Sequence, residues 1–146
     1  MVAGTGKRGR TNALIVVSPN GAFWFEEFKG NLNSAIFIEM LGRLMKSRRR
    51  KVHLVLDSHP AHVSRMTAAA IGAYGGKLEV HFLPGYSPEL NPVEYVNNYV
   101  KATGPRKRLP GSVTELSEIV QSVLGSLART RCRVKSFFGH RELKYI

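Results

Sequence analysis

An α/β fold is predicted from the order of three segments in the middle of the chain. Val52–Leu56 is short and mostly apolar, which is typical of a buried parallel strand. Ala61–Tyr74 is rich in alanine and predicts a helix that a glycine pair ends, and Leu78–Leu83 predicts the next strand. A strand, a helix and a strand at this spacing form a βαβ unit, whose crossover we expect to be right-handed.

A β-hairpin is predicted before this unit. Asn12–Val17 is an apolar run with β-branched residues, and Ala22–Phe28 is expected to return antiparallel to it. The segment between them, Ser18-Pro19-Asn20-Gly21, is a strong turn signal, because Pro fits the second position of a turn and Asn-Gly tolerates positive φ. Met1–Arg10 is glycine-rich and basic, so we expect it to be flexible and the single domain to comprise residues 11–146.

Three further helices are predicted from apolar residues at helical spacing. The first begins near Asn33 and ends in a cluster of basic residues that precedes the βαβ unit. The second begins at Asn91-Pro92, where Asn is expected to cap the helix and Pro fits the first turn. The third begins at Ser112, which forms the pattern of a capping box with Glu115. Residues 102–111, between the last two helices, are expected to form a basic linker.

The charge balance restricts the partners of the protein. Its 146 residues include 22 Lys and Arg against 10 Asp and Glu, which gives a formal net charge of +12. Such an excess favours polyanions, because each phosphate that a basic group neutralises releases condensed counterions. We expect the polyanion to be nucleic acid, and the alternatives are an acidic membrane, an acidic protein or a merely soluble basic surface.

Cysteine content and hydropathy bear on the cellular compartment. Cys132 is the only cysteine, so no internal disulfide can form, which fits a reducing cytoplasm. No apolar run approaches the roughly 20 residues that a membrane span requires, and no signal-peptide core follows the basic N-terminus. We therefore expect a cytoplasmic, nucleoid-associated protein with no membrane partner.

Two acidic residues stand out by their positions. Asp57 is the only aspartate in the chain and follows a predicted buried strand, while Glu94 lies in the first turn of the helix after the next strand. Sites in open α/β sheets gather outside the carboxyl ends of the strands, so the βαβ geometry brings both acids to one edge. Paired carboxylates can hold a hard divalent cation such as Mg²⁺, and two such ions would support an in-line phosphoryl displacement.

Each acid also has a purely structural interpretation. Asp57 can cap the turn after its strand, and Glu94 lies three residues after Asn91, which is the spacing of a capping box. His62 either contacts DNA or orders the loop after Asp57, and the scattered histidines argue against a zinc site. One helical face is polar and suits either phosphate contacts or plain solvation; it comprises Glu94, Asn97, Asn98 and Lys101.

Two segments resemble motifs of a known enzyme family. Leu54–His62, with the sequence Leu-Val-Leu-Asp-Ser-His-Pro-Ala-His, resembles the second-aspartate motif of mariner-like bacterial transposases, the insertion-sequence 630 group. Leu83–Glu94, with the sequence Leu-Pro-Gly-Tyr-Ser-Pro-Glu-Leu-Asn-Pro-Val-Glu, is similar to the third-acid motif of these DDE-type transposases and is the longer and more specific match. The arginine-rich tail with Phe137-Phe138 is also similar to their C-terminus, so the resemblance covers nearly the whole chain from about Gly6.

This resemblance implies a ribonuclease-H-like fold, in which helices flank a mixed sheet, and a Mg²⁺- or Mn²⁺-dependent cleavage and transfer of DNA strands. Asp57 would be the second catalytic and metal-binding acid and Glu94 the third, with water and then a 3′-hydroxyl as the nucleophiles. The residues expected to contact DNA are basic or polar: Lys46, Arg48, Arg49, Arg50, Lys51, His62, Asn97, Asn98, Lys101, Arg106, Lys107 and Arg108.

The sequence departs from the family pattern at the first acid. That acid belongs on a central strand ahead of Asn12–Val17, and no aspartate precedes Asp57. We therefore expect an N-terminally truncated, partial catalytic domain that lacks its central strand, binds metal weakly and is inactive. Ser58 also replaces the usual Asn, and Asn97-Asn98 stands where many relatives have a Trp nearby. The alternatives are a nucleic-acid-binding remnant that regulates a full-length element, as a homodimer or with a full-length transposase, and an unrelated RNA-binding module.

Overall fold

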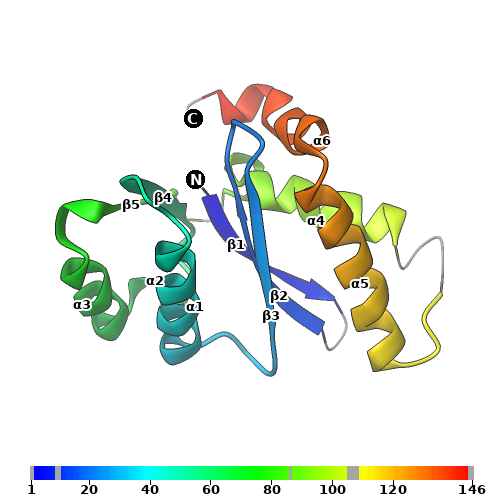
Figure 1. Ribbon diagram of the computed structural model, residues 1–146, viewed down its shortest axis with the longest axis horizontal. Helices are drawn as coiled ribbons and strands as arrows, with labels where there is room; N and C mark the ends of the chain where they lie inside the picture. Colours follow the sequence, from blue (N-terminus) through cyan, green and yellow to red (C-terminus); the bar gives the residue numbers. More distant parts are fainter. Residues whose placement is uncertain (1, 9–10, 86, 105–108, 145–146) are drawn as a thin grey trace.

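A five-stranded mixed sheet with helices on both faces forms the structure (Figure 1). The computed structural model describes residues 2–8, 11–85, 87–104 and 109–144, and side chains from Asn12 onward. The strands lie in the order β3-β2-β1-β4-β5, where β1, β2 and β3 are antiparallel and β1, β4 and β5 are parallel. Their bounds are β1 (Val2–Arg8), β2 (Thr11–Val17), β3 (Phe23–Phe28), β4 (Val52–Leu56) and β5 (Leu78–Phe82). The predicted α/β fold, its hairpin and its βαβ unit are confirmed.

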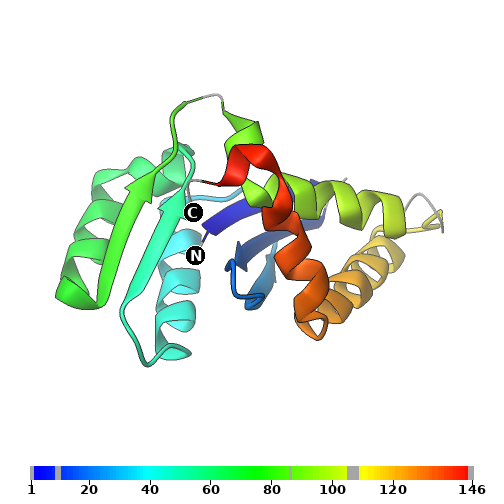
Figure 2. The same cartoon turned by 90° about the horizontal axis from the view of Figure 1, so that it is seen from above.

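Two groups of helices pack on opposite sides of the sheet (Figures 1 and 2). The first group is α1 (Ser34–Lys46), α2 (Pro60–Val63) and α3 (Arg65–Ala73), and the second is α4 (Pro92–Thr103), α5 (Val113–Ala128) and α6 (Arg131–Ser136). Short 3₁₀ helices follow or precede them: η1 (Gly75–Lys77), η2 (Pro88–Leu90), η3 (Phe137–Gly139) and η4 (Arg141–Leu143). None of the helices in the described part of the chain has the length and apolar character needed to cross a membrane.

The side chains of β2 point alternately to the two faces of the sheet, and they contribute to two separate hydrophobic clusters. Ala13, Ile15 and Val17 face α4, α5 and α6, whereas Leu14 and Val16 face α1 and the apolar side of β4. Successive side chains of a strand point to opposite faces of its sheet, so a strand covered on both faces is apolar throughout. The continuous apolar run in β2 thus results from its place between two helical layers.

Side-chain caps begin the helices where the sequence indicates. Asn33 Oδ1 accepts a hydrogen bond from Ile36 N at 2.9 Å and starts α1, and Ser112 Oγ accepts one from Glu115 N at 3.1 Å and starts α5. These bonds satisfy amide groups that have no partner inside the helix. The Glu115 carboxylate accepts a hydrogen bond from Gly111 N at 2.8 Å. In the predicted capping box it would accept from the N–H of Ser112, so the bond forms one residue earlier in the chain.

The N-terminal segment contradicts the sequence-based expectation. Val2–Arg8 forms the strand β1, which occupies the central place in the sheet that we expect to be empty. It pairs with β2 along its whole length but with β4 only at Val2–Val55 and Ala3–Leu56. Backbone pairing needs no apolar side chains, and without β1 the facing edges of β2 and β4 would each carry unpaired N–H and C=O groups.

The predicted helix over Ala61–Tyr74 is divided into two. Ser64 adopts an extended backbone with φ −64° and ψ 156°, and its Oγ accepts a hydrogen bond from Thr67 N at 3.1 Å. Ser64 therefore caps α3 and separates it from α2, a role in which serine competes well with the helical conformation. The short α2 thus stays next to the carboxyl end of β4, which it follows in the chain, and α3 begins as a separate helix.

Amide hydrogen exchange tests the placement of β1. Amides of residues 4–8 that donate to β2 are expected to exchange at least about a hundredfold more slowly than exposed loop amides, because exchange requires local opening of the sheet. The amide of Gly85, which is exposed between β5 and η2, is a matched internal reference. Exchange of residues 4–8 at the rate of Gly85 would contradict the central position of β1.

Candidate active site

Asp57 directly follows β4, at the carboxyl edge of the parallel strands. Its Oδ1 accepts a hydrogen bond from the backbone N–H of His59 at 3.2 Å and another from His62 Nδ1 at 2.8 Å. The turn-capping interpretation of Asp57 is therefore correct, but it accounts for one carboxylate oxygen only. The side chain stays 40% exposed, so the carboxylate also faces solvent.

His62 lies beneath Asp57 in the core. Its side chain is fully buried, and its ring packs on Phe37 with ring centroids 4.5 Å apart. A carboxylate only accepts hydrogen bonds, so His62 Nδ1 carries the proton that it shares between Oδ1 and the backbone oxygen of Asp57. The other ring nitrogen, Nε2, has no hydrogen-bond partner among the described residues. The expected DNA contact by His62 is thus corrected, because no part of the side chain reaches the surface; its place is that of a residue that orients Asp57.

The environment of Asp57 favours its ionised form. Partial burial alone would raise the pKa of this carboxyl group, because a low-dielectric environment penalises charge. The hydrogen bond and the positive potential of His62, together with the backbone N–H of His59, outweigh burial and lower the pKa below its ordinary value of 3.8. Asp57 is therefore a carboxylate across the physiological pH range.

Glu94 lies in the first turn of α4 and is exposed. The helix begins at Asn91, whose Oδ1 accepts a hydrogen bond from Val93 N at 3.0 Å. In a capping box the glutamate would reach the backbone N–H of the cap residue. The N–H of Asn91 instead donates to Pro88 O at 3.0 Å, so the structural interpretation of Glu94 does not hold. The carboxylate of Glu94 is not engaged in starting the helix.

One hollow of about 400 Å³ brings the two acids together. It lies between the loop after β4 and the loop that joins β5 to α4, which is the edge where the strand order predicts a site. Its lining consists of Asp57, Ser58, His59, Leu83, Pro84, Gly85, Ser87, Pro88, Asn91 and Glu94. The two motifs that stand far apart in the sequence thus share one cavity, which we call the acid hollow.

The polar face predicted on α4 is only partly formed. Asn98 and Lys101 are exposed along with Glu94, but Asn97 is 7% exposed and lies on the buried side of the helix. The expectation that Asn97 contacts DNA is corrected for this reason. Because an α-helix has 3.6 residues per turn, a residue three positions after Glu94 does not lie directly above it. Asn97 is rotated toward the buried side of the helix.

The donor set of the acid hollow fits one hard cation. Two carboxylates with solvent access match the preference of Mg²⁺, which commonly keeps several waters and takes one or two carboxylate ligands. In the described part of the chain, no further His, Cys, Asp or Glu joins Asp57 and Glu94 in a potential metal-binding group. The sequence of β1, Val-Ala-Gly-Thr-Gly-Lys-Arg, supplies no carboxylate beside β4. Among the described side chains, the hollow therefore offers two carboxylates as metal ligands.

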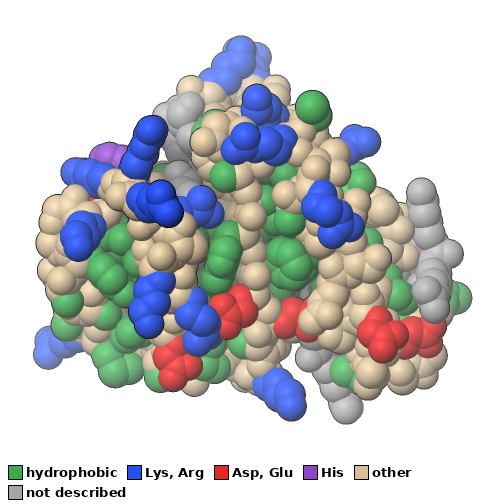
Figure 3. Space-filling view, in the orientation of Figure 1, with side chains coloured by type: hydrophobic (Ala, Val, Ile, Leu, Met, Phe, Trp, Pro, Cys, Tyr) green, Lys and Arg blue, Asp and Glu red, His purple; other side chains and the backbone are tan. Residues whose placement is uncertain are grey.

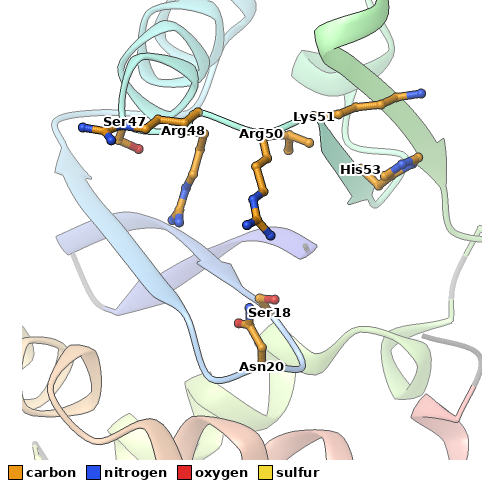
Figure 4. Close-up of a pocket in the computed structure, with 9 residues that line it drawn as sticks. Ser18, Asn20, Ser47, Arg48, Arg50, Lys51 and His53 are labelled. Atoms are coloured by element: carbon orange, nitrogen blue, oxygen red, sulfur yellow. The ribbon is translucent and has the colours of Figure 1, made fainter.

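A basic cluster lies at the other end of β4. Lys46, Arg49, Arg50 and Lys51 are exposed, and Arg48 is partly buried. Arg48 to Lys51 line a second hollow of about 450 Å³, whose opposite wall includes Ser18 and Asn20 of the β2–β3 turn (Figure 4). Figure 3 shows further Lys and Arg side chains over the upper part of one face and acidic side chains along its lower part. Arg106, Lys107 and Arg108, predicted to contact DNA, lie outside the described residues.

Aromatic side chains near the C-terminus pack against the helix of the third-acid motif. The sequence does not predict this packing. The ring of His140 stacks on Tyr95 with centroids 3.8 Å apart, and the Tyr95 hydroxyl donates to Glu89 O at 3.3 Å. Phe137 contacts Tyr99 edge-on, one turn further along α4. The two ring contacts join α4 to the C-terminal segment, and no local pattern predicts them. They fix the helix that presents Glu94.

Replacing His62 tests its control of Asp57. His62→Ala should raise the pKa of Asp57, because the burial penalty remains while the donor is lost. His62→Asn, which keeps an N–H donor, should restore part of the shift. Because Asp57 is the only aspartate, its carboxyl carbon can be followed in an NMR titration. An unchanged pKa in His62→Ala would contradict this role.

The same variant should lower the free energy of unfolding by about 2–4 kcal/mol at neutral pH, as expected for a cavity in the core. A lowered folded-state pKa stabilises the protein above the unfolded value of 3.8, and this stabilisation is lost as the pH falls through the folded value. The difference between the wild-type protein and His62→Ala in urea denaturation should therefore shrink on acidification below pH 4.

Comparison with known proteins identifies the fold. The catalytic domain of Mos1 mariner transposase has 15% sequence identity and a TM-score of 0.68, covering 94% of this chain and 78% of that chain. A simian T-cell lymphotropic virus intasome in complex with PP2A regulatory subunit B56 gamma has 17% identity and a TM-score of 0.63, covering 83% and 46%. The Mos1 catalytic domain has also been solved with Raltegravir and Mg or Mn. None of the curated proteins matches. At such identities the likeness shows the fold, which is the ribonuclease-H-like fold that the motifs imply.

The family is shown by a match along most of the sequence. A family model described as DDE superfamily endonuclease covers residues 2–117, which include both acids, the loop between β5 and α4, and the start of α5. The mariner-like resemblance of the two motifs agrees with the Mos1 structures. The chain belongs to the DDE superfamily endonucleases and has the fold of a mariner-like transposase catalytic domain.

Proposed function

We propose that this chain binds DNA as a transposase catalytic domain whose acid hollow holds a divalent cation between Asp57 and Glu94. The observation that carries this proposal is the meeting of the two family motifs in one cavity at the carboxyl edge of the sheet. A bound Mg²⁺ or Mn²⁺ would supply the Lewis acidity for phosphodiester cleavage and strand transfer. The protein contributes a carboxylate kept ionised by His62 and a second one in the first turn of α4.

We further propose that the chain on its own cleaves DNA poorly. Two-metal catalysis of an in-line displacement needs ligands that bridge both ions, and the acid hollow offers two carboxylates. With β1 in the central place of the sheet, the position beside β4 is taken by a strand without acidic residues. The chain then acts as a DNA-binding protein, alone, as a homodimer or with a full-length transposase, in the nucleoid.

DNA contacts are proposed for two exposed regions. Arg48, Arg49, Arg50 and Lys51 of the basic cluster line one hollow, and the Nε atom of Arg48 is buried without a partner among the described residues. Near the acid hollow, Asn98 and Lys101 extend the exposed face of α4. Such contacts give affinity and register but do not read the base sequence. Binding should therefore be strong, dependent on salt and poorly specific.

A plasmid-nicking assay tests the catalytic part of this proposal. The purified chain with Mg²⁺ or Mn²⁺ should show little or no nicking, and Asp57→Ala and Glu94→Ala should remove any residual activity. Glu89→Gln is a matched control, because Glu89 is exposed on the same loop but does not line the acid hollow. Efficient nicking that Asp57→Ala abolishes would contradict the proposed inactivity and show that two carboxylates are enough.

Duplex binding across a salt series tests the DNA contacts. Six or more phosphate contacts should weaken affinity about a thousandfold between 50 and 200 mM salt. Arg49→Ala/Arg50→Ala should reduce affinity for all sequences alike and flatten the salt dependence by about two released ions. Lys29→Ala, which replaces an exposed residue in the loop between β3 and α1, should have a much smaller effect. Affinity that barely responds to salt would rule out this mode of binding.

A further inference from the structure

Three side chains with metal-binding atoms meet on the outer surface of β4 and β5. His53 pairs directly with Glu79 in the parallel register, and His81 lies two residues beyond Glu79 on the same face of β5. All three side chains are about half exposed. The three come from adjacent hydrogen-bonded strands, so their backbone positions are fixed relative to one another. His53 lies near the amino end of β4 and His81 pairs with Val55, two residues before Asp57, but none of the three residues lines the acid hollow.

The ligand atoms are already spaced as a metal ion requires. His53 Nδ1 lies 3.6 Å from Glu79 Oε2, and His81 Nε2 lies 3.5 Å from Glu79 Oε1. One ligand atom from each of the three residues falls within 4.8 Å of the other two. In a tetrahedral zinc site with bonds of about 2.0–2.1 Å, neighbouring ligand atoms are roughly 3.4 Å apart. The two imidazole rings are nearly parallel, with 16° between their planes and 6.0 Å between centroids. A modest side-chain rotation would therefore bring the two histidine nitrogens to the distance that a shared ion requires.

We propose that His53, Glu79 and His81 form a binding site for Zn²⁺ or a similar transition-metal ion, separate from the catalytic cation site. Two imidazoles and a carboxylate suit zinc, whereas Mg²⁺ prefers oxygen ligands alone. Water completes the coordination on the open, solvent-facing side. A bound ion joins β5, which is an edge strand, to β4 through side chains in addition to the backbone ladder. The site therefore acts as a metal-dependent clamp on the half of the sheet that presents Asp57.

Lys51 competes with a metal ion for the same carboxylate. Its Nζ lies 2.9 Å from Glu79 Oε2, the oxygen that also faces His53. In Figure 4, Lys51 and His53 both extend toward β5, while Arg48 and Arg50 extend away from it toward β1 and β2. A metal ion on this oxygen competes with the ammonium group, so the ion pair lowers the affinity of the site for metal. This competition gives the proposal a variant that should bind metal more tightly than the wild-type protein.

The test is calorimetric titration of tag-free protein with Zn²⁺, with Mg²⁺ titrated in parallel. The wild-type protein should bind one Zn²⁺ at this site with a rise in Tm. His53→Ala and His81→Ala should each weaken binding about tenfold or more, as expected when an inner ligand is lost. Lys51→Ala should strengthen it several-fold. Co²⁺ bound at the same site should give visible absorption bands of a tetrahedral nitrogen and oxygen environment, which His53→Ala should remove.

Two controls separate this site from the other histidines and from the acid hollow. His140→Ala should leave Zn²⁺ affinity unchanged, and so should Asp57→Asn/Glu94→Gln. The replaced residues of the cluster are exposed, and circular dichroism of each variant verifies its fold. The proposal is overturned if the wild-type protein binds no Zn²⁺ at millimolar concentration, or if binding survives both His53→Ala and His81→Ala. Loss of binding in Asp57→Asn/Glu94→Gln alone would place the ion in the acid hollow and overturn it too.

Discussion

Backbone pairing of β1 with its two neighbours connects the antiparallel half of the sheet to the parallel half. The pairing is unequal, because β1 forms a full ladder with β2 but meets β4 over two residues. The parallel half then depends on other contacts to keep its place, and the two helical layers provide them. Residues of β2 and β4 share the core cluster that α1 covers, and Val55 of β4 packs against the opposite cluster. The seam between the halves is thus held mainly by side-chain packing, and the acid hollow opens at the end of this seam.

The acid hollow contains two solvent-accessible acids, Asp57 and Glu94, and each is held in place by neighbouring side chains. Asp57 rests on His62, whose ring is enclosed by apolar residues, and Glu94 begins a helix that aromatic contacts at the C-terminus hold in place. Both charged groups are near solvent, and the support of Asp57, the His62 side chain, is fully buried. Charges can be presented to a ligand in this way without the desolvation cost of burying them.

Local patterns in the sequence predict the elements well and their connections less well. The hairpin, the βαβ unit and the starts of α1, α4 and α5 follow from apolar spacing, turn residues and caps, all of which act over a few residues. The strand β1 does not follow, because a glycine-rich basic segment joins a sheet through backbone groups that every sequence has. Residue type favours a surface position for His62 and Asn97, whereas tertiary packing places both in the core. The cluster of His53, Glu79 and His81 depends on the register of two strands, which no spacing along one strand reveals.

The separation of the acid hollow from the basic cluster constrains how a duplex can lie on this surface. Lys51 precedes β4 and Asp57 follows it, so the two are roughly 20 Å apart along an extended strand. One helical turn of B-form DNA spans about 34 Å, so this distance is a little over half a turn. If a duplex aligned with β4 places one phosphodiester backbone in the acid hollow, the basic cluster would meet the same duplex a little over half a helical turn away.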